Sequence, residues 1–262
     1  MTAGTVAALM AFALTACGGS GGSGGSGGHT DAARPGGRAS ASATGATNPT
    51  AVPSPPPPPP QTPTTAPPPP GGLPSVVAAD GTTIVVGDPA AKHTVTIEED
   101  PRCPICKRFE DANDAQLLAL AKAGTVQLRY VLASFIDSTA GGDGSHRAVN
   151  ALRAAVQENR FPAYHHVLYA NQPPESADGF TTAALLSLAG QVPGLSTPAF
   201  KAAVTTDRYL AFVHRSEAAF LAGGATGTPT VKIDGTTVTG SDANSLFTAS
   251  AFASLLARHG IH

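Results

Sequence analysis

Two cysteines separated by two residues are the strongest chemical signal in the sequence. Cys103 and Cys106 lie in the segment DPRCPICKRFED, where an acidic, strand-like run gives way to a helical pattern. Thiol–disulfide exchange requires a thiolate that attacks a disulfide and a second thiol that resolves the mixed disulfide. A helix N-terminus lowers the pKa of a cysteine placed there. We therefore expect Cys103 to be the exposed nucleophile and Cys106, one turn into the helix, to be the more buried resolving thiol.

The residues around the pair bear on its reactivity. Pro104 suits the first turn of a helix, where its missing N–H costs nothing. Arg102 and Lys107 either add positive potential near the thiolate or are solvated surface charges. Both interpretations are compatible with the sequence.

Two other roles for the pair come from different chemistry. A structural bridge would close a loop of only a few residues, for which the chain-entropy model gives the smallest stabilisation. A zinc site would need further ligands, for which His165 with His166, or His214, are the candidates. Adjacent histidines on a helix point about 100° apart, and the sequence has no second CxxC. We therefore expect neither a metal nor a cofactor.

The third cysteine, Cys17, ends an uncharged apolar stretch that begins at Thr5. This stretch is too short to cross a bilayer as a helix but has the length of a signal-peptide core. Its last four residues, LTAC, resemble a bacterial lipobox, which implies cleavage before Cys17 and lipid attachment to its sulfur. We expect residues 1–16 to be a lipoprotein signal peptide whose start is truncated or whose first codon is misassigned, because no Lys or Arg precedes the core. The alternative is a free Cys17 thiol in an ordinary leader.

The next segment, residues 17–73, lacks the apolar residues needed for a core. It contains GGSGGSGG and later PSPPPPPPQTPTTAPPPPGG, which are typical of flexible coil and of extended polyproline II. At about 3.1 Å per residue, roughly twenty proline-rich residues reach about 60 Å. We expect a tether that holds a folded domain, residues 74–262, clear of a membrane. A proline-rich ligand for another protein is the competing interpretation.

The first part of this domain shows strand and helix patterns in alternation. Runs rich in β-branched residues predict three strands, at residues 82–86, 93–99 and 125–133. Between the last two, a helical pattern follows Cys106 and stops at Gly124. A CxxC at the start of the helix in a strand–helix–strand unit is typical of thioredoxin-like proteins.

Helical patterns dominate the second part of the domain. Five amphipathic segments follow one another from about Ser145 to residue 222, and Asp207 is the expected N-cap of the last one. Strand character returns in a hairpin that turns at Asp234 and Gly235, and a helix ends the chain.

This order of elements, together with VGDPAAKHTVTIEEDPRCPICKRFED, FPAYHHVLYANQP and GATGTPTVKIDG, resembles the DsbA-like thiol:disulfide oxidoreductases over residues 80–258. The resemblance implies an α/β, thioredoxin-like fold with an inserted helical subdomain at about residues 141–222. It also implies that Pro229 is cis and faces the CxxC pair. Thr228 would then offer backbone groups that pair with a substrate as an added strand.

Two features common in that family are missing here. In the strongest oxidases a histidine precedes the second cysteine, and Ile105 cannot donate the same hydrogen bond, so we expect a less extreme oxidant. A buried acid often lies six residues before the first cysteine, a position occupied here by Ile97. Glu98, Glu99 and Asp100 are the nearby candidates for a proton shuttle, but strand alternation sends neighbours to opposite faces.

The pair and the resemblance together predict an extracytoplasmic oxidoreductase that forms disulfide bonds in exported proteins through its CPIC motif. We expect a monomer anchored to the cell membrane by lipid on Cys17 and served by a membrane redox partner. The net charge of −2 gives no indication of nucleic-acid binding. The alternatives are a reductase or isomerase that uses the same thiols, and a lipoprotein that binds partners without redox turnover.

Overall fold

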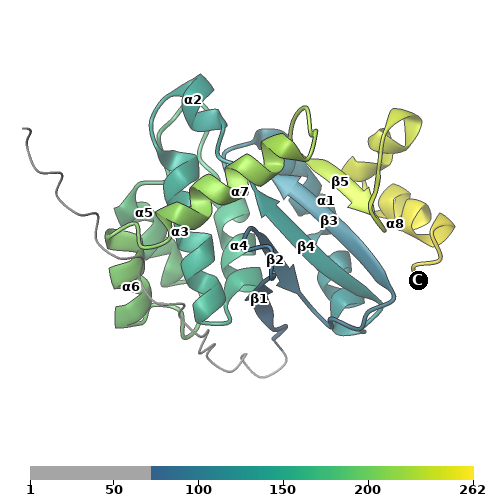
Figure 1. Cartoon of the computed structure of the whole chain (residues 1–262), viewed down its shortest axis with the longest axis horizontal. Helices are drawn as coiled ribbons and strands as arrows, with labels where there is room; N and C mark the ends of the chain where they lie inside the picture. Colours follow the sequence, from purple (N-terminus) through teal and green to yellow (C-terminus); the bar gives the residue numbers. More distant parts are fainter. Residues whose placement is uncertain (1–71) are drawn as a thin grey trace, which may run out of the picture. The chain divides into compact units, whose positions relative to one another are not determined.

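The computed structural model describes residues 72–262, which form one mixed β-sheet and the helices that pack around it (Figure 1). The strands are β1 (Ser75–Val77), β2 (Thr83–Val86), β3 (His93–Glu99), β4 (Val126–Leu132), β5 (Thr230–Ile233) and β6 (Thr236–Thr237). Within this part of the chain the sheet order is β1-β2-β4-β3-β5-β6. The expected signal peptide, Cys17 and nearly all of the expected tether lie outside the described residues.

Among the described residues, helices lie between β3 and β4, between β4 and β5, and after β6. They are α1 (Pro104–Lys122), α2 (Ile136–Ala140), α3 (Gly144–Gln157), α4 (Phe161–Ala170), α5 (Thr182–Ala189), α6 (Pro198–Thr205), α7 (Leu210–Ala222), the 3-10 helix η1 (Gly240–Phe247) and α8 (Ala249–Arg258). Helix α7 crosses the sheet in front of β4 in Figure 1. None of these helices has the length and apolar character that crossing a bilayer requires.

The central strands β3 and β4 place the CxxC segment. They run parallel, with Glu99 opposite Leu132, and α1 makes the crossover between them. On its other side β3 pairs with β5 in antiparallel register, with Glu98 opposite Thr230. The start of β5 therefore lies beside the end of β3, so residues more than 120 positions apart in the sequence meet at the same edge of the sheet.

Most of the predicted elements are found, but the short elements β1 and α2 and the 3-10 helix η1 were missed. The three predicted strands correspond to β2, β3 and β4, and the predicted hairpin turns at Asp234 and Gly235, both with positive φ. β1 and α2 have only three and five residues, too few for a period to be recognised. Helical structure therefore begins at Ile136, a few residues before the expected insertion.

The expected N-cap of α7 is wrong. Helix α7 begins at Leu210 with Tyr209 at the cap position. Asp207 has a φ of 47°, whereas an N-cap residue takes extended backbone angles. Its carbonyl instead accepts a hydrogen bond from the Leu210 N–H at 3.0 Å. Asp207 thus forms the turn before the helix, a position that short polar residues tolerate.

The inserted helices and the sheet share one hydrophobic core. A single continuous cluster of buried side chains includes Val95 and Leu128 from the sheet, Phe109 from α1, and Phe161 and Phe200 from the insertion. Tyr164 packs edge-on against Phe200 and donates a hydrogen bond to the Leu185 carbonyl at 2.8 Å. The insertion is therefore part of the same folding unit as the sheet.

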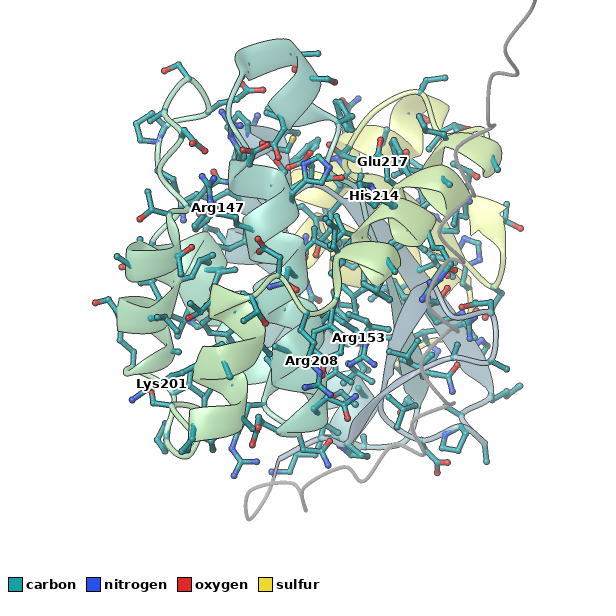
Figure 2. All side chains as sticks on the ribbon, turned by 60° about the vertical axis from the view of Figure 1, so that its left-hand side comes forward. Arg147, Arg153, Lys201, Arg208, His214 and Glu217 are labelled. Atoms are coloured by element: carbon teal, nitrogen blue, oxygen red, sulfur yellow. The ribbon has the colours of Figure 1, made fainter. Side chains whose placement is uncertain are left out.

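Figure 2 labels six side chains of the insertion: Arg147, Arg153, Lys201, Arg208, His214 and Glu217. Arg147 pairs with Asp178 and donates to the Phe180 carbonyl at 2.7 Å. The Arg153 guanidinium lies 4.4 Å from the centroid of the Tyr209 ring. These two arginines therefore stabilise the insertion itself.

We predict that Phe200→Ala lowers the free energy of unfolding by about 3–5 kcal/mol, because it opens a cavity in a shared core. Urea unfolding followed by circular dichroism measures this loss, and the transition should stay single. Leu210→Ala, at a side chain that is 44% exposed, is the control and should change stability by less than about 0.5 kcal/mol. A separate early transition for the insertion would contradict the shared core.

Candidate active site

The CxxC segment caps helix α1. Cys103 occupies the N-cap position with extended backbone angles, and Pro104 is the first helical residue. Both Cys103 and Cys106 are free thiols in this structure. Cys106 is fully buried, and Cys103 is only 7% exposed, so the expectation of an exposed nucleophile is wrong in degree. Ile136 and Tyr169 pack against the pair and restrict access to it.

The pKa values of the two thiols are shifted in opposite directions. The pKa of Cys103 is lowered to about 6, first by a hydrogen bond from the Cys106 thiol and then, against the effect of burial, by the Thr228 side chain and the N–H groups of Cys106 and Ile105. Burial raises the pKa of Cys106 well above its usual value, and the charges of Cys103 and Glu99 raise it further. At neutral pH the pair therefore holds one thiolate, at Cys103, and one thiol.

Thr228 and Pro229 face this thiolate from the start of β5. The Thr228–Pro229 peptide bond is cis, as the resemblance implies. The Cys103 Sγ lies 3.4 Å from the Thr228 carbonyl oxygen. The buried Thr228 Oγ1 has no hydrogen-bond partner among the described residues, which leaves it available to the sulfur. The structure thus brings together Cys103, Cys106, Thr228 and Pro229.

An open groove of about 450 Å³ extends from this point. Its lining includes Ile105, Thr228, Pro229, Lys232, Val238 and Phe247. Ile105 is 38% exposed and presents an apolar surface to the groove. Lys232 pairs with Glu98, its Nζ lying 2.5 Å from Glu98 Oε1. A polypeptide bound here would contact apolar side chains, threonine hydroxyls and an ion pair.

The three acidic residues before the motif have separate partners. Glu98 faces β5 through its pair with Lys232. Glu99 lies on the other face of β3, where its Oε1 is 2.5 Å from His165 Nε2. Ile97, at the position of the family's buried acid, is an apolar core residue. Glu99 is therefore the acid, of these three, whose charge raises the pKa of the buried thiol Cys106.

Asp100 holds the loop between β3 and α1. Its carboxylate accepts hydrogen bonds from the N–H groups of Arg102 and Ile136 and from the Ser145 hydroxyl, at 2.9, 3.1 and 2.6 Å. Burial raises its pKa to about 7, although these three hydrogen bonds oppose the shift. Asp100 thus ties the loop before Cys103 to helices α2 and α3.

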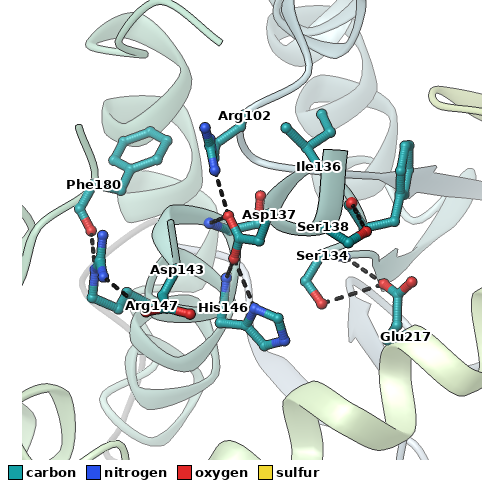
Figure 3. Close-up of polar contacts among 12 residues, drawn as sticks. Arg102, Ser134, Ile136, Asp137, Ser138, Asp143, His146, Arg147, Phe180 and Glu217 are labelled. Carbon is teal, nitrogen blue, oxygen red and sulfur yellow. Dashed lines mark hydrogen bonds and ion pairs between the residues drawn. The ribbon is translucent and has the colours of Figure 1, made fainter. Parts of the chain in front are cut away.

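Arg102 is buried, so its interpretation as a solvated charge is wrong. Its guanidinium lies 2.5 Å from Asp137 Oδ1 (Figure 3). It also donates to the carbonyls of Gly141 and Glu175 at 2.8 and 2.7 Å. Asp137 also accepts a hydrogen bond from the Ser145 N–H at 2.9 Å. These contacts fix the residue next to the nucleophile to the helical insertion.

The three histidines considered as zinc ligands contact different partners. His165 is buried against Glu99, whereas His166 lies at the surface and its Nδ1 is 2.9 Å from Asp114 Oδ2. His214 lies beside His146, with 5.9 Å between ring centroids. The contact between His165 and Glu99 joins residues 66 positions apart, so no sequence pattern could reveal it.

Comparison with known families shows to which family this chain belongs. A family model described as Thioredoxin matches residues 79–249. The chain belongs to the thioredoxin family. A comparison of the sequence with curated proteins found no match.

Several solved structures resemble this thioredoxin-family chain. MdbA of Actinomyces oris, a thiol-disulfide oxidoreductase, is 25% identical, with a TM-score of 0.58 over 71% of this chain and 88% of MdbA. Oxidised BdbD of Bacillus subtilis is 20% identical, with a TM-score of 0.58 over 71% of this chain and 95% of BdbD. The reduced disulfide bond oxidoreductase DsbG of Mycobacterium tuberculosis is 24% identical, with a TM-score of 0.53 over 71% of this chain and 88% of DsbG.

These matches confirm the fold class and the resemblance. The α/β thioredoxin-like fold carries its helical insertion, α2–α7, between β4 and β5. The chain is a thiol:disulfide oxidoreductase of the DsbA type. The roles of the individual site residues remain predictions for this thioredoxin-family chain.

We predict that Cys106→Ala raises the pKa of Cys103 from about 6, because the hydrogen bond from the Cys106 thiol is its largest cause. The ultraviolet absorbance of the thiolate, followed against pH, measures the midpoint. Lys107→Gln is the control, since Lys107 donates to the Tyr169 carbonyl and Asp111 and should leave the midpoint unchanged. A midpoint that stays near 6 in Cys106→Ala would mean that the helix N-terminus alone stabilises the thiolate.

Proposed function

We propose that this protein donates disulfide bonds to exported proteins through the Cys103–Cys106 pair. The observation that carries the proposal is the low pKa of Cys103, about 6. A stabilised thiolate favours the reduced form of the pair, and a bridge whose reduced form is stabilised is a stronger oxidant. The buried, high-pKa Cys106 is suited to close and open the bridge from inside.

The exchange proceeds through two sulfur attacks. A substrate thiolate attacks Cys103 Sγ, the bond to Cys106 breaks, and Cys106 leaves as a thiolate that takes up a proton. A second substrate thiolate then attacks the substrate sulfur of the mixed disulfide, and Cys103 leaves as its stabilised thiolate. The substrate loses two electrons and gains a disulfide, while the pair becomes a dithiol. A membrane redox partner must then accept the two electrons to restore the bridge.

The groove beside the pair supplies a place for the substrate. Thr228 and Pro229 would pair with the substrate backbone as an added strand, a mode of binding in which main-chain hydrogen bonds give affinity. Ile105 and Phe247 offer apolar contacts at the groove. Such recognition suits unfolded, cysteine-containing polypeptides of varied sequence.

The proposed location follows from the sequence alone. Residues 1–16 would be removed as a lipoprotein signal peptide, and Cys17 would carry the lipid. Residues 17–73 would tether the domain, residues 74–262, at the extracytoplasmic face of the cell membrane. We propose a monomer that needs no cofactor or metal and binds no nucleic acid.

A reductase or isomerase is the second candidate. Ile105 stands between the cysteines and donates no side-chain hydrogen bond to the thiolate, which weakens the stabilisation on which an oxidase depends. The same thiols would then pass electrons to substrate disulfides, fed by a membrane reductant. A purely binding lipoprotein would need neither the intact pair nor the low pKa of Cys103.

The equilibrium reduction potential distinguishes the two directions. The full chain carrying Cys17→Ser is equilibrated with glutathione mixtures, and its free thiols are trapped and counted. A value towards about −120 mV, as for DsbA, supports a disulfide donor. A value near about −270 mV, as for thioredoxin, supports the reductase and contradicts the proposal.

We predict different defects for the two cysteine variants. Cys103→Ser should lose oxidation of a reduced test protein, because no sulfur remains for the substrate to attack. Cys106→Ala should also lose this oxidation, because it cannot form the Cys103–Cys106 bridge. Its Cys103 thiolate should still attack a test protein that carries a disulfide and accumulate a mixed disulfide, because no Cys106 thiol remains to displace the substrate sulfur. Non-reducing electrophoresis detects the trapped adduct. Oxidation by the Cys103→Ser protein at the wild-type rate would overturn the mechanism.

A further inference from the structure

The end of helix α4 carries a side chain that has no role in the exchange steps described so far. Gln172 follows Asn171, the C-cap of α4, and its backbone N–H donates to the Tyr169 carbonyl at 3.2 Å. Pro173 and Pro174 come next, and proline cannot continue a helix. The last turn of α4 therefore fixes the backbone of Gln172, whose side chain is half-buried.

The Gln172 amide donates to two carbonyls of the segment that carries the nucleophile. Its Nε2 lies 2.8 Å from the Pro101 carbonyl oxygen and 2.9 Å from the Cys103 carbonyl oxygen. A primary amide has two N–H donors, so it can make both hydrogen bonds at once. Among the described residues, no other side chain donates to either carbonyl. Gln172 therefore bridges the carbonyls on the two sides of Arg102.

These two carbonyls belong to a turn that ends at Cys103. The Cys103 N–H donates to the Asp100 carbonyl at 2.9 Å, which closes the turn over four residues. The Cys103 carbonyl also accepts the first hydrogen bond of α1, from the Lys107 N–H at 3.2 Å. The turn and the helix thus share the backbone of Cys103, and Gln172 holds the point where they meet.

The position of this backbone decides what the Cys103 sulfur contacts. After the hydrogen bond from the Cys106 thiol, the sulfur is stabilised by Thr228 and by the N–H groups of Cys106 and Ile105 in the first turn of α1. The Thr228 carbonyl oxygen lies 3.4 Å from the sulfur on the opposite side. Such contacts weaken steeply with distance and angle, so a displaced Cys103 backbone would stabilise the thiolate less well.

The charged and titratable side chains near the turn have other partners. Arg102 pairs with Asp137, and Lys107 Nζ donates to the Tyr169 carbonyl at 2.7 Å. The Tyr169 hydroxyl donates to the Asp100 carbonyl at 3.2 Å. The Asp100 carboxyl titrates near neutral pH, because burial raises its pKa to about 7. All of these groups are the same in the variants described below, so a difference between those variants reports on Gln172.

We propose that Gln172 is a positioning residue for the exchange reaction, which holds the Pro101 and Cys103 carbonyls and thereby keeps the Cys103 sulfur in front of the first turn of α1. The inference rests on the proposed function in one respect, because it takes Cys103 as the attacking thiol. Gln172 acts through the backbone of the nucleophile and takes no part in the bond changes at sulfur. The helical insertion then contributes directly to the reactivity of the thiol.

Alkylation of Cys103 by iodoacetamide, measured against pH by mass spectrometry, tests this role in the reduced full chain carrying Cys17→Ser. The Cys103 thiolate displaces iodide and the thiol does not, so the rate follows the ionised fraction. We expect Gln172→Met, which keeps the side-chain length but has no N–H donor, to raise the pKa of Cys103 above its value of about 6. The rate at about pH 5 should then fall roughly three- to tenfold, whereas the rate at about pH 9 should change by less than about twofold.

Two further variants separate positioning from a merely structural role. Asn171→Ala is the matched control, because the neighbouring Asn171 amide donates only within its own helix, to the Val167 carbonyl at 2.9 Å. It should change the alkylation rate by less than about twofold at every pH. Gln172→Asn keeps the two N–H donors on a side chain that is one methylene shorter. It should shift the pKa in the same direction as Gln172→Met and to a smaller extent, and it replaces that variant if Gln172→Met does not fold.

Two results would overturn the proposal. One is an unchanged pH profile of alkylation in the folded Gln172 variant, which would leave Gln172 as a tie between α4 and the turn. The other is an equal shift in Asn171→Ala, which would assign the effect to a general loosening of the end of α4. The proposed function fails on a different measurement, the reduction potential of the pair with Gln172 in place, so the two failures are distinguishable.

Discussion

The contact between the Cys103 sulfur and the N-terminus of α1 is the interaction on which the rest of the structure depends. The thiolate in this position is stabilised first by the hydrogen bond from the Cys106 thiol and then by the N–H groups of the first helical turn, and burial works against its charge. Because β3 ends at Glu99 and α1 begins at Pro104, Cys103 lies at the N-terminus of the helix. Pairing of β5 with β3 then brings Thr228 to the same sulfur.

The helical insertion takes part in holding this geometry. Asp137 from α2 neutralises the buried Arg102 next to the nucleophile, and Ser145 from α3 bonds to Asp100 in the same loop. Tyr169 from α4 packs against the cysteines and donates to the Asp100 carbonyl at 3.2 Å. An element that could be taken for an appendage therefore fixes the loop in which the chemistry takes place.

The parts of the fold that the sequence predicts are those set by local patterns. The Asp234–Gly235 hairpin and the start of α1 at Pro104 depend on neighbouring residues, and both are found in the expected places. The burial of Arg102 and the limited exposure of Cys103 depend on Asp137, Ile136 and Thr228, which are distant in the sequence.

The same difference, between local sequence patterns and contacts of residues distant in the sequence, determines which parts of the candidate site could be predicted. The CPIC motif and the TPT segment are visible as short strings, and the structure brings them together. The contact of Glu99 with His165 is not visible, because it depends on how α4 packs against the sheet. Strand alternation correctly separated Glu98 from Glu99, although it could not say which of them faces the buried thiol.

The pair formed by Lys232 and Glu98 gives the groove a property of its own. Each residue offsets the charge of the other at 2.5 Å, so the pair itself presents little net charge to an approaching chain. This ion pair therefore adds little electrostatic steering to the encounter with an acidic or a basic polypeptide. A change in ionic strength should accordingly alter the contribution of this pair to that encounter very little.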